Sequence, residues 1–307
     1  MNQVVVVGNA TVDVIQHVER FARPGETLLC SAMVVCAGGK GLNQAIAAAR
    51  TGAPTRLHAP AADDAHGALL ARAAAAEPGM RADWLATAPP TDISTIWIDA
   101  AGENMIVSAA AAAASLDAAQ AVAACAALGA GDVLLLQGNL SQAATIAAIA
   151  QGRANGARIV LNTAPMRPWM AALLGTVDVV VANAVEAAEL CGGTNAPAAA
   201  LVRAGAAAAI VSLGRHGALL ATGDDSRSSV AAPSVTAIDT AGAGDVLAGT
   251  LAGLLALGSA LDAALLVAVA AASLSVTRTG TTPSFPSREE VAALCAAYGV
   301  CLEPQNA

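Results

Sequence analysis

The stretch Ile238-Asp239-Thr240-Ala241-Gly242-Ala243-Gly244-Asp245 decides the fold, because it predicts a strand that gives way to a helix through a glycine-rich turn. Gly242 and Gly244 lack Cβ atoms, so backbone N–H groups can approach an anion closely, and the positive end of the following helix favours negative charge there. Asp245 has two interpretations at this position: a helix N-cap, or a base that takes a proton from a hydroxyl group beside a phosphate. The stretch alone leaves both open.

Outside this stretch, short apolar runs alternate with alanine-rich segments along the chain. The alternation predicts an α/β fold with a doubly wound, mostly parallel sheet flanked by helices. We predict strands at residues 4–7, 133–136, 159–161, 177–181 and 209–213. We predict helices at residues 41–50, 67–76, 118–128, 142–151, 184–191, 196–204, 245–257 and 261–277.

Two segments, 12–35 and 94–107, break this alternation. Residues 95–99 alternate apolar and polar side chains, the chain turns at 101–102, and the pattern resumes at 105–107, as expected of a short β-hairpin outside the main sheet. A small β lid over a substrate cleft is one interpretation of the two segments. An ordinary extension of the main sheet is the other.

The length of 307 residues favours one principal α/β domain over 1–307, with the lid segments as a small appendage. The hydrophobic fraction of 56% resembles that of a membrane protein, but much of it is alanine, a weakly apolar helix former. Residues 246–276 are the best membrane candidate, and Asp262 interrupts them, so we predict a buried helix pair and no membrane contact. The alanine run 109–114 predicts a helix or a packed connector.

The N-terminal residues, the charge and the cysteines indicate the compartment and the partners. Residues 1–3 lack a basic leader and residues 4–7 are too short for a secretory apolar core, so we expect a cytoplasmic protein. A net charge of −8 leaves no basic face for nucleic acid, and the four histidines lack metal-ligand spacing. The six cysteines show no Cys-x-x-Cys spacing and are expected to be reduced core residues: Cys30, Cys36, Cys125, Cys191, Cys295 and Cys301.

A second glycine-rich turn, Cys36-Ala37-Gly38-Gly39-Lys40-Gly41-Leu42-Asn43-Gln44, leads into a predicted helix. It crowds ammonium and carboxamide donors together and predicts a polar ligand cradle. A Walker-type phosphate loop is excluded, because the four residues that it needs between its first glycine and Gly-Lys-Ser/Thr are missing. Lys40 is the only lysine among 15 basic residues, which indicates a need for a compact positive charge at this place, with chance as the alternative.

Further polar groups follow predicted strands, where ligands bind in open α/β sheets. Asp13 can accept hydrogen bonds from sugar hydroxyls or close an Asx turn. Asn183 and Glu186, three residues apart at a helix start, suit magnesium with its waters or a simple helix cap. Residues 212–217 form a tight turn, suited to backbone contacts with an adenine nucleotide or to a turn alone. No dinucleotide fingerprint follows the strand at 4–7, which weakens an oxidoreductase interpretation.

Together these residues resemble the ribokinase family, also called the phosphofructokinase-B family of carbohydrate kinases, and its ribokinase branch most closely. The resemblance extends over nearly the full chain and rests on two signatures, residues 37–45 and 239–245. Further blocks match in the same order at residues 24–27, 63–67, 183–186, 212–214 and 275–284.

The resemblance implies an ATP-dependent kinase that phosphorylates a primary hydroxyl of a small sugar. Asp245 is then the catalytic base in a turn formed with Gly242, Ala243 and Gly244, where the amides of residues 243–245 form an anion hole. The sugar would contact Thr11, Asp13, Gly39, Lys40, Asn43, Asn139 and Asp245, and ATP would contact Asn183, Ser212, Gly214, Gly217 and Gly244. Magnesium would lie at Glu186 through water, and potassium at Asp239, Ala241, Ser275, Arg278, Gly280 and Ser284, largely on backbone carbonyls.

The acceptor is expected to be D-ribose, giving ribose 5-phosphate, although two positions depart from the family. Thr11 stands where ribokinases usually carry Asn, and Asn139 where they carry Glu. Since Asn both donates and accepts whereas ionised Glu only accepts, deoxyribose, a nucleoside or a sugar phosphate is the alternative acceptor. Arg20 and Arg23 are either contacts for a sugar phosphate or solvated surface residues.

Two further expectations concern assembly and the class of protein. Because lid segments in this family often pair between subunits, we expect a homodimer through the lid. A sugar or nucleotide sensor without turnover is the alternative from a different class.

Overall fold

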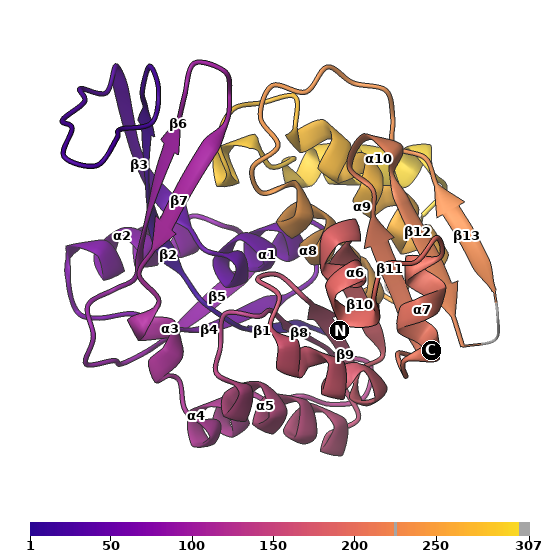
Figure 1. Ribbon diagram of the computed structural model, residues 1–307. Coiled ribbons are helices and arrows are strands. Elements are labelled where there is room, and N and C mark those ends of the chain that lie inside the picture. The colour runs from indigo at the N-terminus through magenta and orange to yellow at the C-terminus, as the bar shows by residue number, and fades with distance from the viewer. Residues whose placement is uncertain (224–225, 301–307) are drawn as a thin grey trace.

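The computed structural model, which describes residues 1–223 and 226–300, has a main sheet of nine strands (Figure 1). In spatial order they are β13 (Arg227–Val230), β12 (Ala218–Thr222), β11 (Ala208–Ser212), β10 (Val179–Asn183), β9 (Arg158–Asn162), β8 (Val133–Leu136), β1 (Val4–Val7), β4 (Thr55–Pro60) and β5 (Met80–Leu85). Every neighbouring pair from β11 to β5 is parallel, whereas β12 runs antiparallel to both of its neighbours, β11 and β13. The predicted, mostly parallel sheet is confirmed.

Helices cover both faces of this sheet, because successive side chains of a strand point to opposite faces. In β1, Val4 and Val6 belong to one hydrophobic core and Val5 and Val7 to the other. The first core lies under α1 (Lys40–Ala49), α2 (Ala65–Ala75), α8 (Ala243–Ala256), α9 (Leu261–Ser275) and α10 (Arg288–Ala297), and the second under α4 (Ala118–Ala124), α5 (Gln142–Ala154), α6 (Ala184–Cys191) and α7 (Pro197–Arg203). The doubly wound architecture is therefore confirmed.

A second, four-stranded sheet stands apart at the upper left of Figure 1. Its order is β3 (Ala32–Gly38), β2 (Thr11–His17), β6 (Ile93–Ile98) and β7 (Asn104–Ser108). The segments predicted as a lid thus form a sheet of their own and do not extend the main one. We call this second sheet and its loops the lid.

The alanine run that follows the lid forms a short helix, α3 (Ala111–Ser115). The backbone amides of Ala112 and Ala113 donate to the buried carboxylate of Asp92 at 2.9 and 2.8 Å. Since Asp92 directly precedes β6, this contact fixes the base of the lid to the body of the protein.

Helices α1 and α8 approach each other through glycines. A Cβ atom at Gly249 would fall 2.3 Å from the carbonyl oxygen of Gln44, and one at Gly253 would fall 2.8 Å from that of Ala48. Asp245, Gly249 and Gly253 are spaced by four residues and therefore lie on one face of α8. This close packing brings the first turn of α8 to the polar start of α1.

The sequence prediction is wrong around the turn that opens α8. No strand leads directly into it: residues 231–242 are neither helix nor strand, and the amide of Ile238 donates to the carbonyl of Val276 at 2.7 Å. Helix α8 begins at Ala243 instead of Asp245, because Gly242 is its N-cap and adopts a left-handed conformation with φ 78°. Asp245 therefore lies in the first helical turn, and the N-cap hypothesis for it is wrong.

Several other predicted boundaries shift. Strand β10 begins at Val179 instead of residue 177, because the 3₁₀ helix η1 (Pro168–Thr176) and its C-cap come directly before it. Helix α4 ends at Ala124 and α9 at Ser275, both earlier than predicted. The sequence analysis missed the strands β4, β5, β12 and β13 and the helix α10.

The predictions on membranes and cysteines have mixed outcomes. Within residues 1–223 and 226–300, no helix is both long and apolar enough to span a bilayer, and residues 246–276 form the predicted buried helix pair, α8 and α9. Cys125 and Cys295 are buried and free as predicted, whereas Cys30 is exposed. Cys301 and the end of the domain predicted to reach residue 307 lie outside the described residues.

Candidate active site

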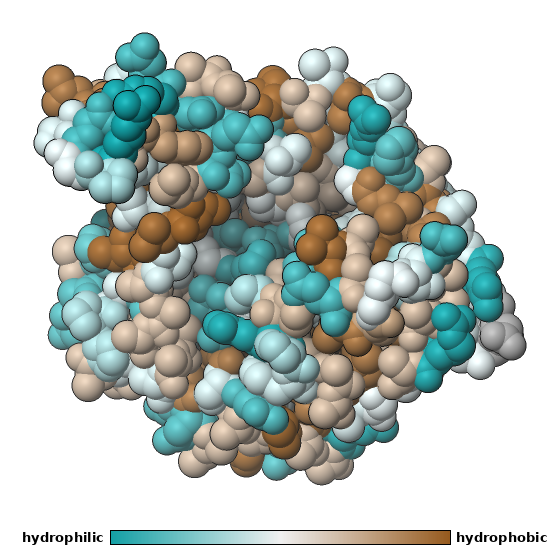
Figure 2. Space-filling view, in the orientation of Figure 1, coloured by the Kyte–Doolittle hydropathy of each residue, from teal (hydrophilic) through white to brown (hydrophobic). Residues whose placement is uncertain are grey.

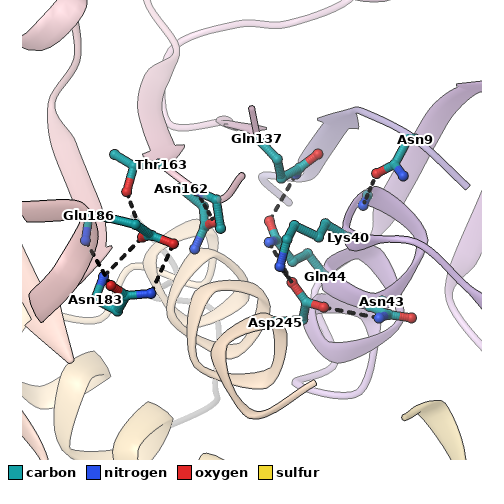
Figure 3. A network of polar contacts seen from close by, with 12 residues as sticks. Asn9, Lys40, Asn43, Gln44, Gln137, Asn162, Thr163, Asn183, Glu186 and Asp245 are labelled. Atoms are coloured by element: carbon teal, nitrogen blue, oxygen red, sulfur yellow. Dashed lines mark hydrogen bonds and ion pairs between the residues drawn. The ribbon is translucent and has the colours of Figure 1, made fainter. Parts of the chain in front are cut away.

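Asp245 is 5% exposed, and both of its carboxylate oxygens accept hydrogen bonds from α1 (Figure 3). Asn43 Nδ2 donates to Oδ2 at 3.0 Å, and Gln44 Nε2 donates to Oδ1 at 2.9 Å. Lys40 Nζ lies 3.9 Å from Oδ1. Lys40, Asn43 and Gln44 are three and four residues apart, so they share one face of α1. Donors on both oxygens fit a carboxylate in its ionised, proton-accepting form.

Gln137 extends this network on the side away from Asn43. It follows β8 directly, and its Nε2 donates to Gln44 Oε1 at 2.8 Å. Gln44 and Gln137 are both 0% exposed. The Asp245 carboxylate is thus connected through Gln44 of α1 to the carboxyl end of the main sheet.

Asp13 brings a second buried carboxylate to the site from strand β2. Its Oδ1 accepts a hydrogen bond from the Thr11 hydroxyl at 2.8 Å. Burial raises the pKa of Asp13 to about 6, the Thr11 hydrogen bond offsets part of this rise, and the charge of Asp245 adds to it. The electrostatic effect of Asp245 indicates that the two carboxylates lie near each other.

Two other residues predicted for the sugar, Gly39 and Asn139, lie on loops at the ends of strands. Gly39 is the N-cap of α1, and its neighbour Gly38 pairs with Thr11 across the lid strands. Asn139 lies on the loop after β8, and its Oδ1 is buried without a hydrogen-bond partner among the described residues. Within the described chain, no hydrogen bond joins Asn139 to Asp245.

One cavity, partly open to solvent, joins the predicted sugar and nucleotide sides. Its walls include Lys40, Gly244 and Asp245, which were predicted for catalysis and the sugar. They also include Asn183, Glu186 and Ser212, which were predicted for ATP and magnesium. In the space-filling view a recess opens beside the lid, and hydrophilic side chains lie in it (Figure 2). A substrate hydroxyl and a polyphosphate can therefore meet in one space.

Asn183 and Glu186 form a capping box at the start of α6. The Asn183 side chain accepts from the Glu186 amide at 2.9 Å, and Glu186 Oε2 accepts from the Asn183 amide at 3.0 Å. Glu186 Oε2 also accepts from the Thr163 hydroxyl at 2.8 Å. The cap interpretation is correct, and the same two residues line the cavity.

The turn predicted for the nucleotide follows β11. Ser212 ends that strand and lines the cavity. Gly214 begins the short 3₁₀ helix η2 (Gly214–His216) and Gly217 is its C-cap, with φ of 57° and 89°. The structure thus brings Ser212 to the cavity and places the two glycines in the turn beside it.

The residues predicted for potassium come from two loops that Asp239 ties together. Its Oδ1 accepts from the Ala241 amide and its Oδ2 from the Gly280 amide, both at 2.9 Å. The side chains of the remaining residues are engaged elsewhere: Ser275 Oγ with the carbonyl of Ala272, Arg278 with Glu290, and Ser284 Oγ with the carbonyl of Thr281.

No role was predicted for Gln137, Asn162 or Thr163, and Gln44 was predicted only as part of the polar cradle at residues 36–44. Gln137 and Thr163 follow β8 and β9 directly, and Asn162 ends β9. Polar residues at the carboxyl ends of parallel strands are a signal for a binding site that could have found them. Gln44 lies four residues after Lys40 on the same helix face, which is a second available signal.

Comparisons with known proteins agree with this geometry. The model of the pfkB family carbohydrate kinases matches residues 1–288. A ribokinase of Haemophilus influenzae is 31% identical over 93% of this chain and 95% of its own length. A deoxyribokinase of Salmonella typhimurium is 30% identical over 94% of this chain and 96% of its own length. A bifunctional ribokinase/ribose-5-phosphate isomerase A of Fructilactobacillus sanfranciscensis is 32% identical over 95% of this chain, which spans only 56% of that relative.

Solved structures show the same fold. A ribokinase of Thermotoga maritima superposes with a TM-score of 0.88 at 28% identity, covering 96% of this chain and 100% of the other. An Arabidopsis thaliana ribokinase complexed with ribose and ATP gives a TM-score of 0.84 at 27% identity, covering 96% of this chain and 99% of the other. Since the family model spans residues 1–288 and the ribokinase and deoxyribokinase relatives are matched over nearly their whole length, the chain belongs to the pfkB family of carbohydrate kinases.

Proposed function

We propose that this chain transfers the γ-phosphoryl group of ATP to a primary hydroxyl of a small sugar, with D-ribose as the first acceptor. The observation that carries the proposal is the shared cavity, where Lys40 and Asp245 lie on the same walls as Glu186 and Ser212. A matched relative is named ribokinase, which supports ribose, and another is named deoxyribokinase, which makes 2-deoxyribose the main alternative.

Asp245 acts as the general base in this proposal. It accepts the proton of the sugar hydroxyl while the hydroxyl oxygen bonds to phosphorus and the bond from phosphorus to ADP breaks. Each carboxylate oxygen already accepts one amide hydrogen bond and can accept another, so a lone pair remains for the substrate. Lys40 Nζ lies 3.9 Å from Asp245 Oδ1. Its positive charge would stabilise the negative charge that develops between the sugar and ATP during the transfer.

The N-terminus of α8 supplies the anion hole. The Asp245 amide already donates to the Gly242 carbonyl at 2.9 Å, and the Ala243 amide donates weakly to the Thr240 carbonyl at 3.4 Å. Gly244 lines the cavity. We therefore assign the amide of Gly244 as the main donor to the transferring phosphoryl group, supported by the positive end of the helix.

Unpaired amide oxygens support a sugar as the ligand of the lid side. Asn43 Oδ1 and Asn139 Oδ1 are buried and lack a donor among the described residues. A buried acceptor without a partner costs about 1–3 kcal/mol, and sugar hydroxyls are donors that relieve this cost. Thr11, Asp13 and Gly39 complete the sugar side in this proposal.

Glu186 would hold magnesium through water. Its carboxylate already accepts hydrogen bonds from Thr163 and Asn183, so indirect contact fits it better than direct ligation. Magnesium keeps several of its waters in most protein sites, which suits this position. The bound ion would neutralise charge on the phosphates of ATP, next to Asn183 and Ser212.

Potassium would lie between the loops that carry Asp239 and Gly280. The side chains of Ser275, Arg278 and Ser284 are engaged in other contacts, so these residues would contribute backbone carbonyls. A cation there would favour the ordered arrangement of the loop that precedes α8.

A sugar phosphate fits the lid less well than a free sugar. The Arg20 guanidinium is paired with the Glu26 carboxylate in an exposed loop. This pairing neutralises the positive charge that would otherwise bind a substrate phosphate. The Arg23 amide donates to the same carboxylate at 3.0 Å.

We also propose a homodimer through the lid. Strands β3 and β7 are the outer strands of the lid sheet, and both carry exposed apolar side chains. These are Met33, Val34 and Val35 on β3 and Met105, Ile106 and Val107 on β7. Exposed apolar edge strands pair readily with another chain, and a second copy of the lid offers matching surfaces.

Two further proposals concern the domain organisation and the cellular compartment of the protein. The chain is one α/β domain whose lid covers about residues 12–35 and 94–107. It works in the cytoplasm, which is supported by five free cysteines in the described chain, since thiols persist in a reducing compartment.

An ADP-release assay tests the proposed function. The purified chain is mixed with ATP and magnesium, with and without potassium, and with D-ribose, 2-deoxy-D-ribose, a nucleoside or a hexose phosphate. We expect the highest kcat/KM with D-ribose and faster turnover with potassium. ADP release at background level with every acceptor, together with sugar binding by calorimetry, would favour a sensor and contradict the proposal.

A further inference from the structure

Two buried glutamines behind Asp245 have no role in the function proposed above. Gln44 and Gln137 are both 0% exposed, although polar side chains of this kind are rarely buried completely. Gln137 Nε2 donates to Gln44 Oε1 at 2.8 Å, and Gln44 Nε2 donates to Asp245 Oδ1 at 2.9 Å (Figure 3). The three side chains form a relay of hydrogen bonds that ends on the catalytic carboxylate.

The direction of the relay follows from amide chemistry. A glutamine side chain has one acceptor oxygen and one donor nitrogen. Because Gln137 gives its NH₂ group to the oxygen of Gln44, Gln44 must turn its own NH₂ group toward Asp245. If Gln44 were flipped, its oxygen would face the carboxylate and its nitrogen would face another NH₂ group. Gln137 therefore fixes the orientation in which Gln44 can bind Asp245.

The burial of Gln137 is costly in itself. Its Oε1 has no hydrogen-bond donor among the described residues, and it lies where a Cβ atom at Gly8 would come within 2.1 Å. An apolar side chain of similar size would avoid the cost of an unpaired buried oxygen. An apolar residue could not replace the hydrogen bond that Gln137 Nε2 donates to Gln44.

We propose that Gln44 and Gln137 are positioning residues that hold the carboxylate of Asp245 in the orientation for proton transfer. Asn43 holds Oδ2 and Gln44 holds Oδ1, so rotation of the carboxylate breaks both hydrogen bonds. Neither glutamine is among the residues that line the described cavity, so they act through Asp245 and not on the substrate. The inference rests on the proposed role of Asp245 as the base.

Methionine substitutions test the relay, because methionine matches glutamine in length and has no amide. Gln44→Met is expected to lower kcat roughly 10- to 100-fold, since a hydrogen bond to a charged group is lost, with KM for sugar and ATP within about threefold. Gln137→Met is expected to lower kcat by a smaller factor, because Gln44 keeps its reach but loses its fixed orientation. The matched control is Gln142→Met, at an exposed position of α5, which should leave both constants unchanged.

The double variant Gln44→Met/Gln137→Met separates a relay from two independent effects. In a relay, Gln137 acts only through Gln44, so the double variant keeps the kcat of Gln44→Met. If Gln137→Met lowers kcat by the same factor in both backgrounds, the relay is wrong. Unchanged kcat in Gln44→Met also overturns it.

Two further measurements keep the outcome clear. Calorimetric binding of sugar and of an ATP analogue reports whether each variant still forms its site, and a rise of KM in parallel with the fall of kcat would indicate general damage and contradict the positioning role. Asp245→Asn is measured alongside. If that variant keeps turnover, the proposed function fails; if it loses turnover while Gln44→Met does not, only the relay fails.

Discussion

Gly249 of α8 lies directly against the backbone of Gln44 in α1, where an added Cβ atom would meet the Gln44 carbonyl oxygen at 2.3 Å. The contact is one helical turn beyond Asp245, on the same face of α8. It therefore sets the distance at which the carboxylate meets Asn43 and Gln44. Helix α8, which forms the first part of the segment that looks membrane-like in sequence, is thereby held against α1.

Gly249→Ala is expected to lower the free energy of unfolding by about 1–3 kcal/mol, because the clash is with backbone and the helices must separate. Turnover should fall as well, since Asp245 moves with α8. Urea unfolding and ADP release measure the two effects. Gly193→Ala, where an added Cβ meets nothing within 4 Å, is the control. Equal stability of the two variants would show that the helices do not depend on this contact.

The free energy of unfolding should depend on pH through the ionisation of Asp13. Its pKa is raised by burial from 3.8 to about 6, so the folded state binds an extra proton between these values. Stability from this group is complete below about pH 4 and is lost as the pH rises through about 6. The loss amounts to at most about 3 kcal/mol.

Asp13→Asn isolates this effect, because the amide does not titrate. We expect the variant to gain stability relative to the parent as the pH rises from about 4 to about 6, with a constant difference above that range. Urea unfolding of both proteins across this range measures the difference. A difference that does not depend on pH would contradict the raised pKa.

Asn139→Glu tests the acceptor side of the site. The buried Oδ1 of Asn139 lacks a donor among the described residues, and a carboxylate there could accept two hydroxyl groups. We expect the kcat/KM ratio of D-ribose to 2-deoxy-D-ribose to change by about tenfold, since a site that binds a hydroxyl rejects analogues without it. An unchanged ratio in the ADP-release assay would place Asn139 outside the sugar pocket.

One added charge should prevent the proposed pairing of lids between two subunits. Val107 on the outer strand β7 is 69% exposed, so Val107→Glu should fold normally but disrupt pairing of lids. Light scattering at micromolar concentration is expected to show a dimer for the parent and a monomer for the variant. Ile146→Glu, on α5 away from the lid, should remain dimeric. A monomeric parent protein would reject the proposed dimer.

Much of the fold could be predicted because its strands are short apolar runs, such as 4–7 and 133–136, that end in polar or glycine residues. Strands β4 and β5 escaped prediction because Arg56, His58 and Asp83 interrupt their apolar pattern. Arg56 and Asp83 pair with each other near the edge of the sheet, where polar side chains are tolerated.

The local chemistry of the site could also be predicted, but its connections could not. Lys40 and Asn43 lie in a glycine-rich signature that can be recognised in one segment. The hydrogen bond from Gln44 to Asp245 joins residues 201 positions apart, and its geometry depends on how closely Gly249 lets two helices pack. The start of α8 at Ala243 depends on the left-handed conformation of Gly242, which the glycine permits but does not require.

The rate of phosphoryl transfer by Asp245→Asn tests the central claim most directly. The substitution keeps the size of the side chain and removes its capacity to accept a proton. In an ADP-release assay with saturating D-ribose and ATP, kcat is expected to fall by about two to four orders of magnitude, while calorimetry shows unchanged affinity for ATP. Turnover within tenfold of the parent protein, with the same sugar and the same affinity for ATP, would contradict the assignment of Asp245 as the base.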